Sequence, residues 1–176
     1  MAETPVFRYE MADYLDVGTE EAPDIQVMSV FENIDESPNA QTTEKHYTAN
    51  KSTTTITTGY QTNFPITGDL YKNNKVIEFL RDIGEEQKLG VQANYYRVRL
   101  YQPIEGKSNT YYARKFLVGF SISTIGGGGG EIVNLDGEMN SLKDAVIGEF
   151  NTETRTFTPK DELDSLPPVD ESEPVF

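Results

Sequence analysis

The chain contains no cysteine and no tryptophan, and His46 is its single histidine. Without cysteine, a thiolate zinc site, an iron–sulfur cluster, a cysteine nucleophile and a disulfide framework are excluded. One imidazole in a polar segment gives no basis for a metal site. It gives none for a Ser–His–Asp triad either, because no nucleophile-elbow motif accompanies it. We therefore expect no metal, no cofactor and no enzymatic activity.

The sequence also lacks long apolar runs and a basic excess. No run approaches the roughly 20 apolar residues of a membrane-spanning helix. The opening MAETPVFRYE lacks the basic and apolar regions of a secretion signal. With 29 acidic against 15 basic residues and a net charge of −14, the overall field has the wrong sign for binding nucleic acid phosphates. We expect a protein made in a cytoplasm, with no membrane and no nucleic acid bound specifically.

Most of the acidic excess lies at the two ends of the chain. Residues 1–24 carry seven acids and one arginine, and residues 160–176 carry six acids and one lysine. A length of 176 residues suits one core. We predict an acidic N-terminal arm with the first strand region at 1–24, a β domain at 25–159, and an acidic, flexible C-terminal arm at 160–176, where prolines are frequent and apolar residues few.

The middle of the chain is predicted to be mainly β, a sandwich or barrel of antiparallel strands with one flanking helix. A helix is predicted within 72–83 from apolar residues at helical spacing, with Asn73 or Asn74 as N-cap and Gly84 at its end. Pro65 is expected to end the second strand. The predicted strands are 25–31, 52–64, 93–103, 110–125, 131–140 and 144–151.

Between the first two strands, residues 32–51 form a polar stretch that we predict to be a long loop. Connections of this length in compact domains usually serve a function or are mobile. The residues expected in the core are apolar and fall on one parity of a strand or one stripe of the helix. They are Ile56, Tyr60, Val76, Leu80, Val98, Phe116, Val118, Phe120 and Ile122.

Three further patterns suggest chemistry only superficially. The five glycines at 126–130 precede a strand-like segment and no Lys-Ser/Thr pair, which favours a flexible connection over a phosphate loop. The segment NLDGEMN lacks the ligand spacing of a calcium loop. Tyrosines and arginines on 93–103 and 110–115 could form a platform for single-stranded nucleic acid, but ordinary cross-strand pairing explains them as well.

Four passages, taken in order, resemble the major tail tube proteins of long-tailed, siphovirus-type bacteriophages. The resemblance covers roughly residues 7–158. It departs at Leu142-Lys143, where related sequences often carry a glycine, and in the acidic C-terminal extension. The passages are SVFENIDESPNAQTTEKHYTANKS, TTITTGYQTNFPITGDLYKNNKVIEFLRDIG, NTYYARKFLVGFSISTIGGGGGE and LDGEMNSLKDAVIGEFN.

The resemblance implies a tail-tube fold and a structural role. Such proteins form hexameric rings that stack into a tube, with the inner sheets joined edge to edge around a channel. DNA passes through this channel without specific binding, and an acidic wall would repel its phosphates. The implied partners are other copies of the chain, a tape-measure protein, and a tail terminator or distal tail protein. The implied location is the tail of the virion, after assembly in the host cytoplasm.

On this reading the polar loop 32–51 would contact the next ring. The residues proposed for ring-to-ring contact are Pro38, Asn39, Thr42, Glu44 and Tyr47. Polar residues on one parity of 131–140 would line the channel, although an outer, solvated face explains the same pattern. They are Asn134, Asp136 and Glu138.

Two other functions remain open. The inner tube of a contractile tail or injection machine shares the fold, and a sheath gene beside this one would favour it. An acidic β-sandwich module that binds carbohydrate is a different class, supported only by tyrosines expected at the surface, Tyr95, Tyr101 and Tyr111.

Overall fold

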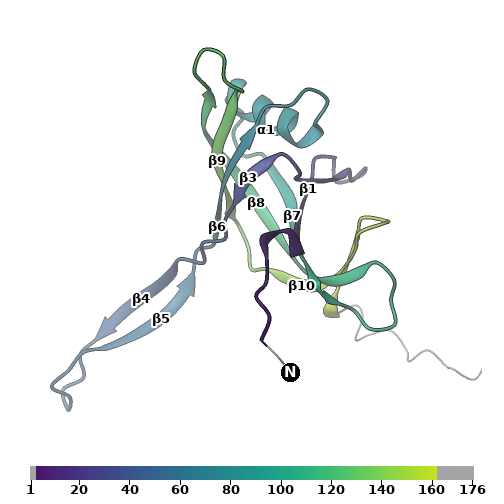
Figure 1. Ribbon diagram of the computed structural model, residues 1–176. Coiled ribbons are helices and arrows are strands. Elements are labelled where there is room, and N and C mark those ends of the chain that lie inside the picture. The colour runs from purple at the N-terminus through teal and green to yellow at the C-terminus, as the bar shows by residue number, and fades with distance from the viewer. Residues whose placement is uncertain (1–2, 162–176) are drawn as a thin grey trace, which may run out of the picture. The chain divides into compact units, whose positions relative to one another are not determined.

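The computed structural model describes residues 3–161, which are mainly antiparallel strands with one α-helix, α1 (Lys75–Glu85) (Figure 1). The predicted mainly β class with a single helix is confirmed. Residues 162–176, which hold nearly all of the predicted C-terminal arm, lie outside the described residues. A short 3-10 helix, η1 (Arg8–Glu10), precedes the strands, which are β1 (Met11–Asp16), β2 (Ile25–Val27), β3 (Phe31–Ile34), β4 (Ala40–Lys45), β5 (Thr54–Tyr60), β6 (Asn63–Asp69), β7 (Gln92–Pro103), β8 (Thr110–Gly126), β9 (Asn134–Ser141), β10 (Val146–Asn151) and β11 (Thr156–Pro159).

The chain divides into two compact units. Unit 2 comprises Asp13–Tyr95 and Phe116–Asp144. Among the described residues, unit 1 comprises 3–12, 96–115 and 145–161. In unit 2 the hydrogen-bonded strands follow the order β2-β1-β7-β8-β9-β6-β3. Strand β9 pairs antiparallel with β6 on one side and with β8 on the other, so that Glu138 lies opposite both Pro65 and Ser121.

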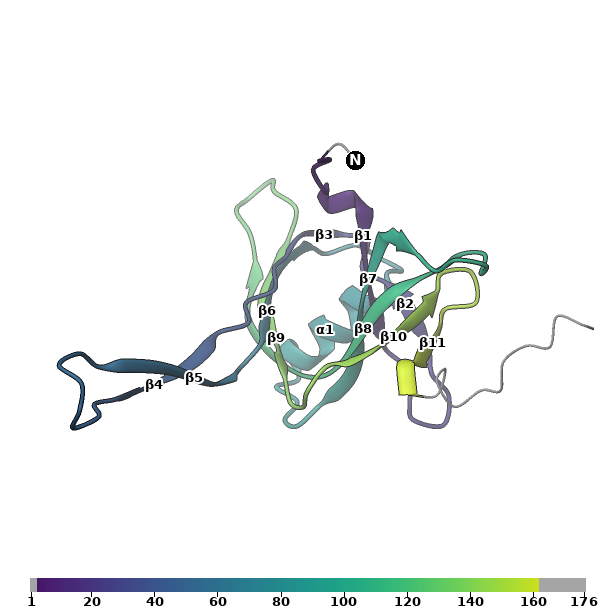
Figure 2. The same cartoon turned by 90° about the horizontal axis from the view of Figure 1, so that it is seen from below.

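Strands β4 and β5 form a separate two-stranded sheet, and this corrects the predicted loop 32–51. Figures 1 and 2 both draw this hairpin leading away from the larger sheet of unit 2. All six residues of β4 are exposed, and so are most of β5. Ile56 and Tyr60, predicted in the core, are 38% and 69% exposed. That prediction was wrong because only Thr43 faces Ile56 and only the small Ala40 faces Tyr60 across the ladder, and the described part of the chain covers neither side chain.

The parity argument for residues 52–64 failed at two breaks in the chain. The β4–β5 register shifts between Gln41 and Thr42, and two residues then separate β5 from β6. Pro65 does not end a strand, since β6 runs through it. The Pro65 carbonyl accepts from the amide of Asp35, just past the end of β3, and a proline is tolerated at such a margin of a sheet.

The hydrophobic core of unit 2 joins α1 to the apolar face of the sheet. The Phe64 ring centroid lies 4.8 Å from that of Tyr95 and 4.9 Å from that of Phe116. Tyr95 is fully buried, which removes it from the predicted surface tyrosines. Among the other predicted core residues of unit 2, the buried ones are Val76, Leu80 and Val118, and those partly buried against the core are Phe120 and Ile122.

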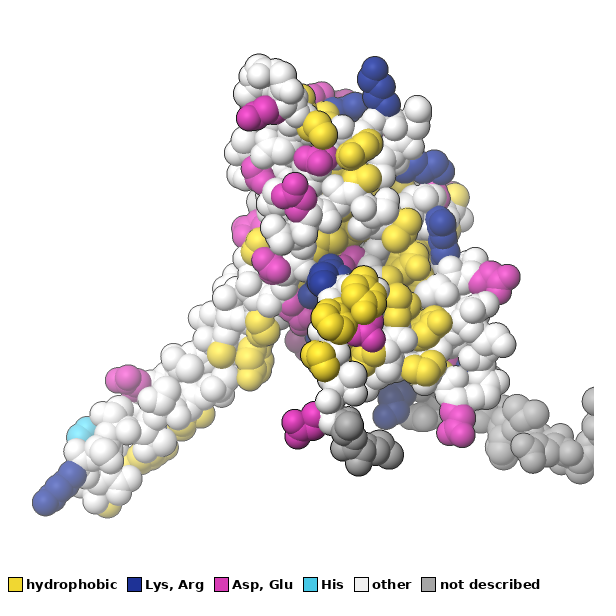
Figure 3. All heavy atoms as spheres, in the orientation of Figure 1, with side chains coloured by type: hydrophobic (Ala, Val, Ile, Leu, Met, Phe, Trp, Pro, Cys, Tyr) yellow, Lys and Arg dark blue, Asp and Glu magenta, His cyan; other side chains and the backbone are white. Residues whose placement is uncertain are grey.

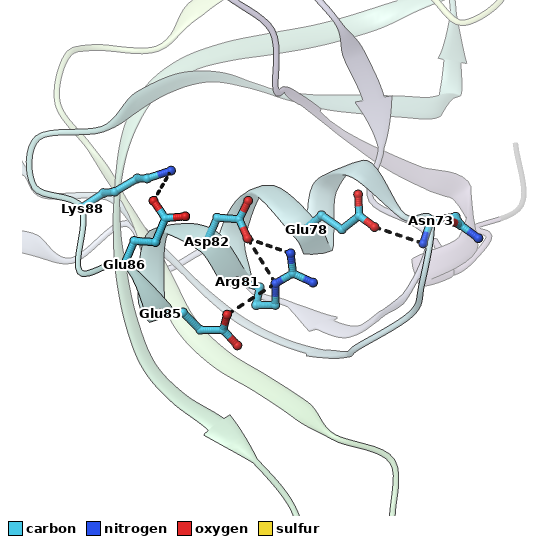
Figure 4. Close-up of polar contacts among 7 residues, drawn as sticks. All are labelled: Asn73, Glu78, Arg81, Asp82, Glu85, Glu86 and Lys88. Atoms are coloured by element: carbon cyan, nitrogen blue, oxygen red, sulfur yellow. Dashed lines mark hydrogen bonds and ion pairs between the residues drawn. The ribbon is translucent and has the colours of Figure 1, made fainter.

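The helix begins where the sequence predicts a cap. Asn74 accepts a hydrogen bond from the amide of Ile77 at 3.1 Å, and α1 starts at Lys75 rather than at residue 72. Its outer side carries charged contacts (Figure 4). Arg81 donates two hydrogen bonds to Asp82, and these raise the pKa of the guanidinium. Glu85 lies 3.7 Å from Arg81 and completes this exposed cluster.

Gly84 does not end the helix as predicted; it lies in the last turn. A Cβ at this position would come within 2.9 Å of Ile122 Cγ2 and 3.0 Å of Ile125 Cδ1. The glycine therefore allows the helix to approach β8 closely, and the helix continues to Glu85.

The predicted strand 25–31 is interrupted. Its ends form β2 and the start of β3, with buried Met28 between them. The amide of Met28 donates to the carbonyl of Asp13 and so extends the pairing of β2 with β1, and a bend at Val30 then precedes β3.

Unit 1 contains an aromatic cluster of its own. Strand β10 pairs with the first part of β8 and with β11. The Tyr96 ring lies 5.4 Å from Phe150 and 5.6 Å from Phe157, and the Arg99 guanidinium lies 4.6 Å from the centroid of Tyr112. In these contacts the tyrosines and arginines of β7 and β8 pack within the chain, as ordinary cross-strand pairing predicts, and this favours pairing over a platform for nucleic acid. Val98, predicted in the core, is fully buried.

Candidate functional site

Within residues 3–161, each strand at the end of the order of the larger sheet, β2 or β3, has a neighbouring strand on one side only. Strand β3 pairs with β6 on one side only, and its residues Glu32 and Asn33 are exposed. Strand β2 pairs with β1 at the other end. An unpaired edge presents backbone donors and acceptors to another strand and favours association unless it is protected. Both edge strands are short, which limits unspecific pairing with other chains.

One face of β9 carries the three residues predicted to line a channel. Asn134, Asp136 and Glu138 are half-buried and alternate with fully buried Leu135 and Met139. Because successive side chains of a strand point to opposite faces, the three lie on the face opposite the α1 core. The structure therefore brings them together.

Hydrogen bonds hold these polar side chains in place. The Asn134 amide donates to Asp136 at 3.0 Å. The Asn63 amide, on neighbouring β6, donates to Glu138 at 2.9 Å, and the Asn140 amide lies 3.4 Å from the other oxygen of Glu138. Carboxylates bonded in this way keep a fixed position on the sheet surface.

The charge of this sheet region has one sign. Strands β3, β6 and β9 and residues 116–126 of β8 contain no lysine or arginine. Asp69 of β6 lies opposite Asn134 in the ladder, and Asp136 and Glu138 follow Asn134 on the same face of β9. Such a surface would repel a polyanion.

The five residues predicted for ring-to-ring contact are spread along the hairpin rather than gathered in one cluster. Pro38 and Asn39 lie at its base, Thr42 and Glu44 in β4, and Tyr47 in the connection between β4 and β5. All five are exposed. Asn39 is structural. Its φ is +46°, and its side-chain amide donates to the Gln61 carbonyl at 3.1 Å and to Asn63 at 2.8 Å. It therefore fixes the hairpin to the start of β6.

Sequence reasoning predicted the second strand of the hairpin within 52–64, but it missed the first strand, β4, and the exposure of both strands. Ile56 and Tyr60 belong to the same exposed element as the five predicted residues. The run STTTITT was the available signal, because it has strong strand propensity but almost no apolar residue to bury. Figure 3 shows hydrophobic side chains along one side of the hairpin, and a basic side chain, the histidine and an acidic side chain towards its free end.

Two kinds of site are not found in the described residues. Residues 3–161 contain no group of three or more histidine, aspartate or glutamate side chains placed to hold a metal ion. Within the same range, no helix is long and apolar enough to cross a membrane.

Comparison with known proteins identifies the fold. No family model matches the sequence, and no curated protein matches it significantly. A chain from the tail of an empty GTA particle with C6 symmetry matches with a TM-score of 0.55 and 11% identity, over 88% of this chain and 99% of that one. The SPP1 tail tube matches with a TM-score of 0.60 and 10% identity, over 81% and 78% of the two chains.

The fold is that of tail tube proteins. A chain from the sheath/tube terminator of the PVC extracellular contractile injection system shares it, with a TM-score of 0.54 and 10% identity over 84% of this chain and 99% of that one. The tail-tube fold predicted from the four sequence passages is therefore confirmed. At these identities the likeness concerns the fold alone, and it extends to both phage tails and contractile injection systems.

Proposed function

We propose that this chain is the structural, non-enzymatic subunit of a phage tail tube, in which rings of six copies stack around a channel that delivers DNA. The observation that carries the proposal is the tail-tube fold over almost the whole length of a chain from a C6-symmetric GTA tail. The open edges β2 and β3 support it, because neighbouring copies could complete each other's sheets there.

In this proposal the face of Asn134, Asp136 and Glu138 lines the channel. Its support is the absence of lysine and arginine from the surrounding strands, together with the hydrogen bonds that fix the carboxylates. A wall of this kind lets DNA pass without adhering, since phosphates meet no positive charge. The hairpin β4–β5 contacts the next ring. A tape-measure protein and a terminal tail protein act as partners, and assembly takes place in the host cytoplasm before the tube becomes part of the virion.

Electron microscopy of the purified chain tests the proposal. We expect hollow filaments with a regular axial repeat and six-fold end views, either spontaneously at high concentration or after addition of sheared tail fragments as seeds. Monodisperse monomers under both conditions would contradict it.

The inner tube of a contractile machine is a second candidate, favoured by the likeness to the PVC sheath/tube terminator chain. A sheath gene beside the gene for this chain would support it. Binding of the purified chain to the sheath protein, measured by co-sedimentation with preformed filaments, would decide between the two kinds of tube. The carbohydrate-binding alternative loses one of its three tyrosines, because Tyr95 is buried in the core.

A further inference from the structure

The hairpin β4–β5 reaches solvent on both of its faces. Thr43 lies opposite Ile56 and Glu44 lies opposite Thr55, and cross-strand partners share a face of the sheet. Since all four are exposed, neither face is covered by the described part of the chain. A two-stranded hairpin alone is only marginally stable in water, so a partner that covers this one would add to its stability.

The free end of the hairpin is basic, although the molecule is acidic. Residues 45–51, which we call the hairpin tip, contain two lysines and one histidine and no acid, whereas the chain as a whole has a net charge of −14. Lys45 and Lys51 form no ion pair within residues 3–161. Between them, the Tyr47 side chain is 50% exposed, and the amide of Asn50 donates to the Tyr47 carbonyl and closes the turn. The tip therefore carries one exposed aromatic ring, with a lysine before it and a lysine after it in the sequence.

A pocket of about 400 Å³ in unit 2 is acidic, whereas the hairpin tip is basic. Asp16 and Glu20 provide acid at its margin, and its lining contains no lysine or arginine. Pro23, Ala93 and Leu117 give it an apolar part. An aromatic side chain bearing a hydroxyl suits such a mixed pocket, and cations beside that ring would meet the acids.

The acidic wall of the pocket is preformed. The turn 17–24 is closed by a hydrogen bond from the Val17 amide to the Asp24 carbonyl and another from Thr19 to Ala22. Asp16 Oδ1 accepts from the amides of Gly18 and Asp24 at 3.1 and 2.9 Å. At Gly18 a Cβ would lie 2.3 Å from the Ala22 carbonyl oxygen, so the turn is tightly packed. Docking here would need little reorganisation.

We propose that the hairpin tip of one copy docks into this pocket of a second copy. Tyr47 enters beside Leu117 and Pro23, and Lys45 and Lys51 lie against Asp16 and Glu20. The inference rests on the proposed tube function and names the two surfaces that meet. Charge complementarity selects the second copy as occupant, because the basic tip and the acidic pocket belong to the same chain and every subunit carries both.

Charge reversal at the tip tests the proposal. In the double variant Lys45→Glu/Lys51→Glu, like charges would face each other, and we expect the critical concentration for filament formation to rise by about tenfold or more. The matched control is Lys72→Glu/Lys143→Glu, which changes the net charge equally at two exposed lysines outside the tip. Circular dichroism confirms that both variants fold. Equal critical concentrations for the two variants would overturn the proposal.

A second reversal identifies the receiving surface. Glu20→Lys/Glu21→Lys alters the exposed acid that lines the pocket and its neighbour in the turn, and leaves the structural Asp16 in place. We expect it to raise the critical concentration similarly. All four substitutions in one chain restore opposite charges across the contact and should bring the critical concentration back towards that of the unaltered chain. No recovery in the fourfold variant would overturn the assignment of the pocket. Failure of the unaltered chain to form filaments would instead contradict the proposed function, and this inference with it.

Discussion

The hairpin β4–β5 and the helix-covered sheet of unit 2 are both antiparallel, but only the sheet has an interior. Along β6, buried Phe64, Ile66 and Gly68 alternate with less buried residues, whereas every residue of β4 is exposed. Backbone pairing and β-branched threonines are enough to make strands in both places. The difference shows that the sheet is stabilised by burial within one chain, whereas the hairpin gains no such burial from the described residues.

The largest difference is expected between two aromatic residues four positions apart. Phe64→Ala removes a fully buried ring packed on Tyr95 and Phe116, and should lower the free energy of unfolding by about 3–5 kcal/mol. Tyr60→Ala, at a side chain 69% exposed, should change it by less than about 0.5 kcal/mol. Urea denaturation of monomeric protein measures both. Similar losses for the two variants would mean that the hairpin is packed in solution.

A matched pair of glycines gives the next largest effect. Gly84→Ala forces a methyl group against Ile122 and Ile125, and the overpacking, about 1–3 kcal/mol, should outweigh the better helix propensity of alanine. Gly59→Ala in β5 meets no atom within 4 Å and should be neutral or stabilising by up to about 1 kcal/mol. Thermal unfolding of the two variants measures the difference. A lower midpoint for both variants, or a higher midpoint for both, would contradict the prediction.

Two asparagines provide a smaller contrast. Asn74→Ala removes the acceptor for the Ile77 amide at the start of α1 and should destabilise the fold by about 1 kcal/mol. Asn50→Ala, in the exposed hairpin tip, should change stability by less than about 0.5 kcal/mol. The measurement is again urea denaturation, and a loss at Asn50 equal to that at Asn74 would contradict the assignment of the tip as unpacked.

Removing the hairpin altogether should have the smallest effect on the monomer. Ala40 and Tyr60 lie opposite each other, so an Asn-Gly turn can join them in place of residues 41–59. We expect the free energy of unfolding to change by less than about 0.5 kcal/mol, since no core residue is lost. Electron microscopy should show no filaments under conditions in which the full chain assembles. Normal filaments from the shortened chain would contradict the ring-to-ring role.

The parts of the structure that the sequence predicted are those where burial dictates the pattern. Helical spacing identified Val76 and Leu80, and alternation identified Phe116 and Val118, because each must face one core. The parity of 131–140 likewise placed Asp136 and Glu138 together on the polar face of the sheet. In these segments the same requirement, that one face is buried and the other is not, recurs at each turn of the helix or every second residue of the strand.

The first strand of the hairpin, β4, escaped prediction because none of its residues is buried. Residues 40–45 contain one alanine and otherwise polar side chains, so they carry no periodic signal and their pattern predicts a loop. Their strand is specified by hydrogen bonds to β5, a non-local property that one segment does not reveal. The packing role of Gly84 could not be predicted either, because it depends on contact with Ile122, which belongs to a strand far away in the sequence.

The basic tip and the acidic pocket are different surfaces of one chain, and this gives any assembly built through them a direction. Each contact consumes one tip and one pocket and leaves an unused tip at one end of the growing polymer and an unused pocket at the other. The two ends therefore differ chemically, and a terminating protein could recognise either end by its charge alone.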